Sequence, residues 1–172
     1  MLTETKFSLR QFNTNDLEAV IEINRICLPE NYASFFFIDT FQNCPSAFRV
    51  AVVGTRIVGY MMCRIEHGFS DIKRLKFIRK GHIISIAVLP EFRRAGIASE
   101  LVKQTLGALR EMKAEECYLE VRGTNETAIK LYEKLGFSLA RQVPHYYADG
   151  AEALVMVIPL EGGALPSQSA RA

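Results

Sequence analysis

The stretch from Ser85 to Ser99, SIAVLPEFRRAGIAS, holds the residues whose types and spacing best suit chemistry. An apolar, strand-like run is followed by a proline, two adjacent arginines and a glycine, and then by a helical pattern. The first turn of a helix exposes backbone N–H groups that lack intrahelical partners, and the helix dipole favours an anion there. Gly96 leaves room for a ligand beside the backbone, while Arg93 and Arg94 add positive charge. The stretch fits a phosphate or pyrophosphate site, or else a solvated turn with two surface arginines.

The elements that must position this stretch follow from the hydrophobic pattern. Apolar residues recur at helical spacing in some segments and alternate or cluster as strands in others. The expected helices cover residues 14–28, 32–43, 96–113 and 124–136, and the expected strands cover 7–12, 48–53, 56–66, 81–89, 117–122, 137–144 and 153–160. Gly54 and Thr55 form a hairpin turn, and Gly136 caps the last helix. This order predicts an α+β fold with a largely antiparallel sheet and one parallel crossover.

Length and composition exclude several classes of protein. The 172 residues predict one domain over residues 1–160, followed by a small, polar and disordered tail over 161–172. The net charge of +2 is too small to attract DNA or a membrane over long range. No apolar run or N-terminal signal pattern predicts a membrane span or export. The four cysteines are scattered without a CxxC pair, which argues against a zinc knuckle and favours a reducing, cytoplasmic setting.

Two motifs together resemble a known family. RRAGIA, Arg93 to Ala98, matches Arg/Gln-x-x-Gly-x-Gly/Ala and resembles the acyl-CoA pyrophosphate loop of the GNAT acetyltransferases. NETAIKLYEKLGF, Asn125 to Phe137, matches the later Asn-x-x-Ala-x-x-Leu-Tyr-x-x-x-Gly-Phe element of that family, in the right order. The resemblance spans about residues 5–160. It implies the GNAT fold, with a mixed, mostly antiparallel sheet of seven strands, four main helices, and a splay between the fourth and fifth strands.

The resemblance implies acetyl-CoA as co-substrate, with no dedicated metal, and assigns residues to it. The pantetheine arm is expected along Ile86, Ala87 and Val88, and the pyrophosphate around Arg93, Arg94, Ala95, Gly96, Ile97, Ala98 and Ser99. A free N–H near Val88 is expected to polarise the acetyl carbonyl. Asn125 serves as a helix cap, a CoA contact or both. Tyr132 stands at the family's general-acid position, with packing between helix and sheet as the alternative.

A narrower resemblance comes from two short segments far apart in the chain. CLPENY (Cys27 to Tyr32) and YYADGAEA (Tyr146 to Ala153), together with GHIISIAV, resemble the catalytic subunit of NatA-type N-terminal α-amino acetyltransferases and its archaeal homologues. In that subfamily the two segments face each other across a peptide groove. The implied substrate-binding residues are Pro29, Glu30, Tyr32, Tyr146 and Tyr147. His145 stands where the family usually has a basic residue, which leaves the substrate preference open.

Three residues are candidates for the general base, and the sequence does not choose among them. His82 has a suitable intrinsic pKa, although a histidine that starts a strand can equally bond to backbone. Glu120 alternates with apolar neighbours and therefore points away from their face, as a base, a solvent-facing residue or a partner of Arg122. Glu30, in the loop between the first two helices, lines the substrate entry in the NatA-type family, and its alternative is a loop acid that caps a helix.

The leading prediction is an enzyme that moves acetyl from acetyl-CoA to the free α-amine of a protein or peptide N-terminus in a direct ternary complex. An α-amine has a pKa of roughly 7.7–8.0, against about 10.4 for lysine, so it is the easier nucleophile at neutral pH. The alternatives are a GNAT enzyme for lysine or a small amine, and a non-catalytic acyl-CoA-binding regulator. The resemblance leaves open an auxiliary subunit and ribosome association. The basic stretch 73–80 is a loop or an extension of a strand, and it guides an acidic substrate, docks on ribosomal RNA or protects a hairpin edge.

Overall fold

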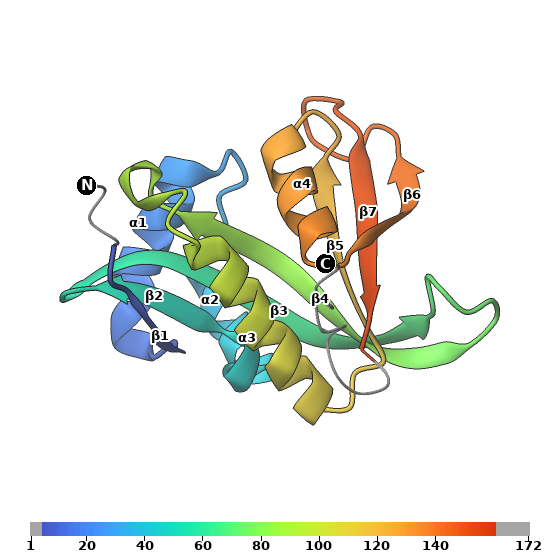
Figure 1. The fold of residues 1–172 in the computed structure, drawn as a ribbon, viewed down its shortest axis with the longest axis horizontal. Helices are drawn as coiled ribbons and strands as arrows, with labels where there is room; N and C mark the ends of the chain where they lie inside the picture. The colour runs from blue at the N-terminus through green and yellow to red at the C-terminus, as the bar shows by residue number, and fades with distance from the viewer. Residues whose placement is uncertain (1–4, 161–172) are drawn as a thin grey trace, which may run out of the picture.

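This computed structural model describes residues 5–160, which form a mixed arrangement of helices and strands (Figure 1). The expected tail over 161–172 lies outside them. In chain order the elements are β1 (Ser8–Gln11), α1 (Leu17–Cys27), α2 (Ser34–Asn43), β2 (Arg49–Val53), β3 (Arg56–Phe69), β4 (Phe77–Val88), α3 (Ile97–Glu111), β5 (Glu116–Arg122), α4 (Glu126–Lys134), β6 (Ser138–Val143) and β7 (Ala153–Pro159). Every helix and strand expected from the hydrophobic pattern is present. None of the described helices is long and apolar enough to cross a membrane.

The strands form a sheet of seven in the order β1-β2-β3-β4-β5-β7-β6. Every neighbouring pair is antiparallel except β4 and β5, which are parallel and joined through α3. This confirms the predicted α+β class, the mostly antiparallel sheet and its one parallel crossover. The parallel pairing covers only Lys80–His82 of β4 against Glu116–Tyr118 of β5. Beyond it the two strands part, which is the splay that the family resemblance implies.

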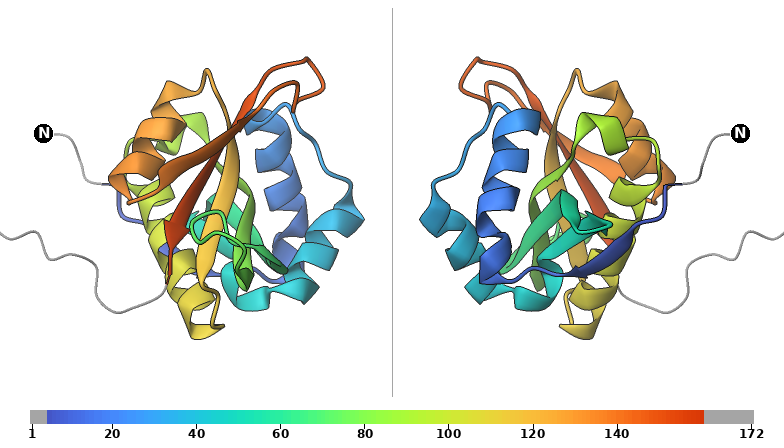
Figure 2. Two further views of the ribbon diagram at one scale, coloured as in Figure 1. Left: turned by 90° about the vertical axis from the view of Figure 1, so that its right-hand side faces the viewer. Right: turned by 90° about the vertical axis from the view of Figure 1, so that its left-hand side faces the viewer.

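Helices cover both faces of the sheet. Figure 2 shows α1 and α2 on one face and α3 and α4 on the other. The helix α3 buries Leu101, Leu106 and Leu109, which recur at the spacing of one helical stripe, against the central strands. Gly136, with φ +100°, ends the α4 segment as predicted, and the Phe137 N–H bonds back to the Tyr132 carbonyl. The core therefore lies in two layers, one on each side of β2–β4.

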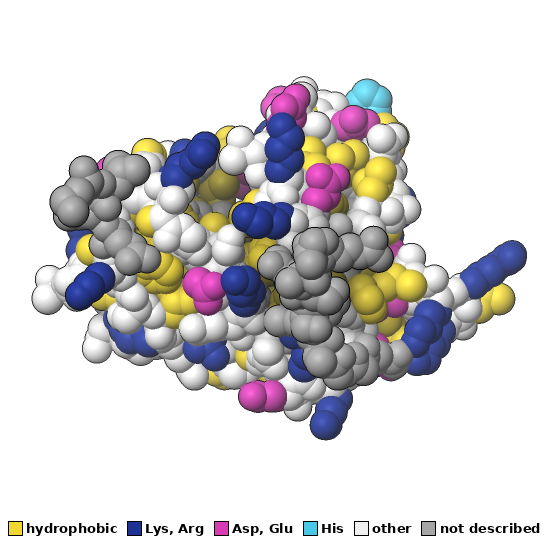
Figure 3. Space-filling model, in the orientation of Figure 1, with side chains coloured by type: hydrophobic (Ala, Val, Ile, Leu, Met, Phe, Trp, Pro, Cys, Tyr) yellow, Lys and Arg dark blue, Asp and Glu magenta, His cyan; other side chains and the backbone are white. Residues whose placement is uncertain are grey.

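The basic stretch 73–80, which the sequence leaves open as a loop or an extension of a strand, is divided between the two. Residues 77–80 of the basic stretch belong to β4, and residues 73–76 lie in the connecting loop. Asp71 in this loop pairs with both Lys80 and Arg141, so the end of the hairpin is tied to β4 and β6. In Figure 3 the hairpin protrudes on the right and carries several Lys and Arg side chains.

The helix α3 packs so closely on β4 that a side chain at Gly81 would collide with a leucine of the helix. A Cβ placed on Gly81 would lie 2.5 Å from Leu109 Cδ1 and 2.9 Å from Leu109 Cδ2, and Leu109 is fully buried. We therefore expect Gly81→Ala to lower the free energy of unfolding by about 1–3 kcal/mol through overpacking. Urea unfolding followed by circular dichroism measures this change.

Gly107 in the same helix provides the matched control for this substitution. A Cβ there meets nothing within 4 Å, so Gly107→Ala should raise the free energy of unfolding by roughly 0.5–1 kcal/mol, as alanine does inside helices. A Gly81→Ala protein as stable as the unchanged chain would show that Leu109 has room to move, against this account of the packing.

Candidate active site

The parting of β4 from β5 opens a pocket of about 990 Å³. Its walls come from the α1–α2 loop, β4, the start of α3, β5, α4 and the β6–β7 loop. Of the residues predicted for a site, the pocket is lined by Pro29, Glu30, Tyr32, Ile86, Ala87, Val88, Arg93, Arg94, Gly96, Ile97, Ala98, Ser99, Glu120, Asn125, Tyr132, Tyr146 and Tyr147. His82 and Ala95 do not line it. The fold thus brings segments from five separate parts of the chain to one cleft.

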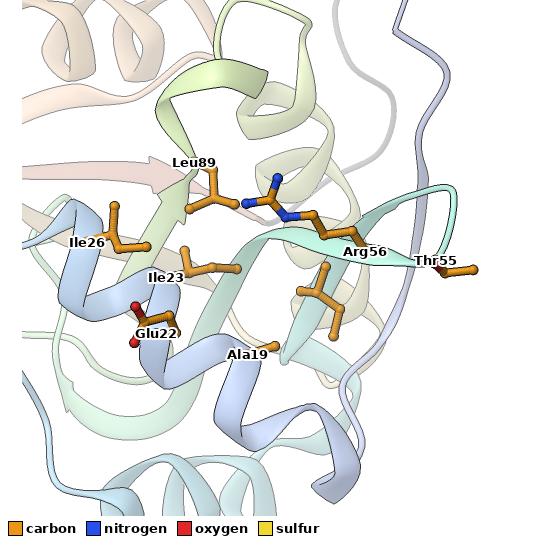
Figure 4. A pocket seen from close by; sticks show the side chains of 8 residues that line it. Ala19, Glu22, Ile23, Ile26, Thr55, Arg56 and Leu89 are labelled. Carbon is orange, nitrogen blue, oxygen red and sulfur yellow. The ribbon is translucent and has the colours of Figure 1, made fainter.

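A smaller hollow of about 350 Å³ lies between α1 and the start of β3 (Figure 4). Its walls are mainly apolar side chains such as Ile23, Ile26 and Leu89. Its two charged residues are each engaged elsewhere, Glu22 with Arg25 and Arg56 with Glu91. No set of polar groups converges on this hollow, so the larger pocket is the candidate site.

The start of α3 forms one end of the pocket and suits a phosphate group. Arg94 and Gly96 both have positive φ, +65° and +82°, which turns the backbone before the helix in the manner of anion-binding nests. No side chain caps α3 at Gly96. A Cβ at Gly96 would meet nothing within 4 Å, so the backbone is open to a ligand there. Arg93 Nε donates to the Val88 carbonyl at 2.9 Å and ties this loop to β4.

The last residues of β4 present backbone groups to the cleft. Antiparallel strands alternate between pairs that bond each other and pairs that point outward. The Leu89 N–H donates to Val58 on β3 at 2.8 Å, so the N–H groups of Val88 and Ile86 point away from β3. Because β5 has parted from β4 at this level, those groups face the pocket instead of another strand.

The helix α4 brings Asn125 and Tyr132 to the pocket. The Asn125 side chain accepts from the Ala128 N–H at 3.2 Å, so it does cap the helix. Tyr132 is only 6% exposed, and its ring packs edge-on against that of Phe137. Burial raises the pKa of Tyr132, so its hydroxyl is protonated at neutral pH. Among the described residues, no group forms a hydrogen bond with that hydroxyl, which leaves it available to a ligand.

At the opposite end, Arg122 joins the two loops that form the mouth of the pocket. Its guanidinium donates to Glu30 of the α1–α2 loop and to Asp149 of the β6–β7 loop, each at 2.8 Å. It also lies 4.0 Å from the centre of the Tyr147 ring. The pKa of Tyr147 is raised to about 12, mainly by burial and to a lesser extent by the negative charge of Glu30. This hydroxyl therefore also carries its proton at neutral pH.

The backbone of the α1–α2 loop is held from inside the core. Buried Asn24 of α1 donates to the Glu30 carbonyl at 3.2 Å and to the Tyr60 hydroxyl at 3.0 Å. The Tyr60 hydroxyl in turn lies 2.7 Å from Ser85 Oγ on β4. This chain of hydrogen bonds fixes Glu30 relative to β3 and β4, although Glu30 itself lies in a loop.

His82 does not line the pocket itself but contacts Glu120, which does. Its Nε2 lies 2.7 Å from Glu120 Oε2, as expected for neighbouring strands, and its Nδ1 lies 3.0 Å from Glu66 Oε1. The imidazole stacks on Tyr118, with ring centres 4.2 Å apart. Burial by itself lowers the pKa of His82, but hydrogen bonds and charge from Glu120 and Glu66 outweigh it and the net shift is upward.

No role for Glu66 or Tyr118 follows from the sequence, and Arg122 has different partners in the structure from the one that the sequence predicted. Glu66 and Tyr118 lie in strands where alternation shows only which face they occupy, and not which residue stands opposite. Arg122 was noted as a partner for Glu120, yet it pairs with Glu30 and Asp149 instead. No motif marks these residues, because their meeting depends on the strand register and on loop placement. No group of three or more His, Cys, Asp or Glu within residues 5–160 is arranged to hold a metal ion.

Comparison with known proteins gives a consistent picture. The profile of the acetyltransferase (GNAT) family matches residues 17–137. The N-alpha-acetyltransferase of Saccharolobus solfataricus is 48% identical over 156 residues, which cover 90% of this chain and 93% of that protein. Ard1 from Thermoplasma volcanium has a solved structure with 29% identity and a TM-score of 0.79, covering 91% of this chain and 99% of that one. Arabidopsis thaliana Naa50 in complex with the bisubstrate analogue CoA-Ac-MVNAL has 26% identity and a TM-score of 0.75, covering 88% and 97%.

The Arg122 bridge predicts that both mouth loops loosen together when it is removed. In Arg122→Gln, we expect amide hydrogen exchange over residues 28–33 and 145–151 to speed up roughly twofold to fivefold, the range for a partly exposed ion pair. Exchange measured by mass spectrometry tests this. Arg25→Gln, which breaks only the Arg25–Glu22 pair on α1, should leave both loops unchanged. Faster exchange in one loop alone would contradict a bridging role.

Proposed function

This chain belongs to the acetyltransferase (GNAT) family, and we propose that it transfers the acetyl group of acetyl-CoA to the free α-amine of protein or peptide N-termini. The observation that carries the proposal is the two-ended pocket. One end has the open backbone of α3 and β4, and the other has a tyrosine-lined mouth, with Glu120 and Tyr132 in the same cavity. The similarity to proteins named N-alpha-acetyltransferase supports it.

The residues at the first end fit coenzyme A. The α3 amides near Gly96, with Arg94 beside them, would hold the pyrophosphate, and the outward backbone groups of Ile86 would bond to the pantetheine arm as a neighbouring strand does. Acetyl-CoA supplies an activated acetyl thioester when it is bound. The Val88 N–H is then the donor that would polarise its carbonyl.

Glu120 is the best placed residue to receive the proton of the substrate amine. It lines the pocket, and one of its carboxylate oxygens is already fixed by His82. Glu30 also lines the pocket, but its carboxylate is engaged by Arg122, which suits a role in orienting the substrate. His82 does not line the pocket, so it would act on the amine through Glu120. An α-amine has a pKa of roughly 7.7–8.0, so a carboxylate, alone or through a water, is a sufficient base.

Tyr132 and the mouth tyrosines would serve the two partners of the reaction. The protonated hydroxyl of Tyr132 would donate to the departing sulfur as a general acid. Tyr32, Tyr146 and Tyr147 line the opposite end of the pocket and would bond to the backbone of the first peptide residues.

The proposal includes partners and a compartment. Protein and peptide N-termini are the substrates in this proposal, and the family resemblance leaves open an auxiliary subunit and ribosome association. The exposed Arg74 and Arg79 at the protruding β3–β4 hairpin suit an anionic surface such as ribosomal RNA. All four cysteines are free thiols, in keeping with a reducing cytoplasm.

Release of free thiol from acetyl-CoA tests the acceptor directly. We expect turnover with a short peptide that starts with a free serine or glutamate. A matched peptide with a blocked α-amine and one internal lysine should give none, because lysine is mostly protonated at neutral pH. Equal turnover with both peptides would make lysine the acceptor. No turnover with either, despite measurable CoA binding, would favour a non-catalytic binding protein.

The role of Tyr132 can be separated from a packing role by one substitution. In Tyr132→Phe we expect kcat to fall by about 10²–10⁴-fold, the usual contribution of a general acid. Binding of CoA, measured by calorimetry, should be unchanged because the ring stays in place. Loss of CoA affinity and of kcat to the same extent would show that the hydroxyl only supports the fold of the site.

A further inference from the structure

Glu66 reaches His82 from a strand that contributes nothing to the pocket lining. It lies on β3, and neither it nor His82 lines the cavity. Its Oε1 is 3.0 Å from His82 Nδ1, while its Oε2 accepts from the Tyr118 hydroxyl at 2.6 Å. Both oxygens of this carboxylate are therefore engaged by groups from β4 and β5. Glu66, His82 and Glu120 form a continuous line of contacts across three strands.

The two contacts of His82 favour the doubly protonated form of its ring. Each ring nitrogen faces a carboxylate oxygen, and a neutral imidazole has a proton for only one of them. An imidazolium is the form of the ring that donates to both carboxylates at once. The ring is also fixed in orientation, because it stacks on Tyr118 at an interplanar angle of 13°.

The charges around His82 are consistent with this state. The titratable and charged groups near it are Arg64, Glu66 and Cys63 on β3, Lys80 on β4, Tyr118 and Glu120 on β5, and Tyr32 of the α1–α2 loop beside Glu120. Lys80 is paired with Asp71. Arg64 and an imidazolium then balance the two carboxylates of Glu66 and Glu120. Burial alone would raise the pKa of Glu66, but hydrogen bonds from Tyr118 and His82 bring it below its ordinary value.

We propose that Glu66 is a positioning residue of the acetyl-transfer site, which holds His82 as an imidazolium in one orientation so that His82 fixes Glu120 against the substrate amine. Glu66 touches neither substrate nor acetyl-CoA and acts only through His82. The inference rests on the proposed function for its kinetic consequence, but the state of His82 is a property of the protein alone. The Tyr118 hydroxyl supports Glu66 in turn.

The first test is the titration of His82, which requires no turnover. Imidazole ¹H–¹⁵N spectra of the full chain follow its three histidines, and His82→Asn assigns the signal. We expect His82 to titrate above about pH 6.5, the ordinary value. In Glu66→Gln, which keeps the size of the side chain and removes its charge, the midpoint should move to lower pH. A midpoint at or below the ordinary value in the unchanged chain would overturn the proposal, whether or not the protein acetylates peptides.

The second test is kinetic and uses the acetyl-acceptor peptide. Glu66→Gln should lower kcat by about 10- to 100-fold, the cost of a misplaced catalytic group, with little change in KM. Its alkaline limit of kcat should move to lower pH, since His82 loses its proton earlier. Glu111→Gln, at the exposed end of α3, is the matched control and should alter neither. Unchanged kcat in a folded Glu66→Gln protein would overturn the positioning role.

Tyr118→Phe covers the case in which Glu66→Gln does not fold. It keeps the ring stacked on His82 and removes only the hydroxyl that donates to Glu66. We expect a smaller fall in kcat with KM retained, because Glu66 keeps its charge but loses one of the two contacts that hold it in place. A Tyr118→Phe protein with the kcat of the unchanged chain would contradict the line of contacts.

Discussion

The short parallel pairing of β4 with β5 is the constraint on which the rest of this structure depends. Because the two strands bond only over Lys80–His82 and Glu116–Tyr118, everything beyond that point must part. The gap can hold a ligand, since the outward backbone groups of β4 have no strand to bond there. Pairing along the full length of both strands would fill the cleft with a continuous sheet. The α3 helix, which joins the two strands, begins at the open end of that gap.

The end of this pairing is also where the polar residues gather. Glu66, His82 and Glu120 occupy adjacent strands at the level where the gap begins, and Arg122 lies at its far end. Such charges are costly to bury unless each is paired and hydrogen-bonded. Here each carboxylate has a cationic or hydroxyl partner at 2.6–3.0 Å. The side chains are therefore held in defined positions before any substrate is bound, which is the preorganisation that catalysis requires.

The two loops at the mouth of the pocket are held in place by hydrogen bonds from helices and strands of the core. Asn24 and Tyr60 are buried in the core and hold the backbone of the α1–α2 loop at Glu30. Arg122 extends from β5 and connects this loop to the β6–β7 loop. Both loops at the mouth are therefore held by contacts with the core and with β5. The hairpin of β3 and β4 is tied down separately through Asp71.

The sequence by itself determined the elements, the class of fold and most of the pocket lining. Hydrophobic periodicity shows which face of each element is buried, and the RRAGIA and NETAIKLYEKLGF motifs are local patterns whose residues lie on one loop or one helix. The alternation of Glu120 with Leu119 and Val121 placed Glu120 on the opposite face from these buried residues. Only the tertiary structure decided that Glu66 meets His82, that Arg122 pairs with Glu30, and that His82 contacts Glu120 without lining the pocket itself. Those contacts depend on strand register and on loops far apart in the chain, and periodicity carries no information about which residue lies opposite another.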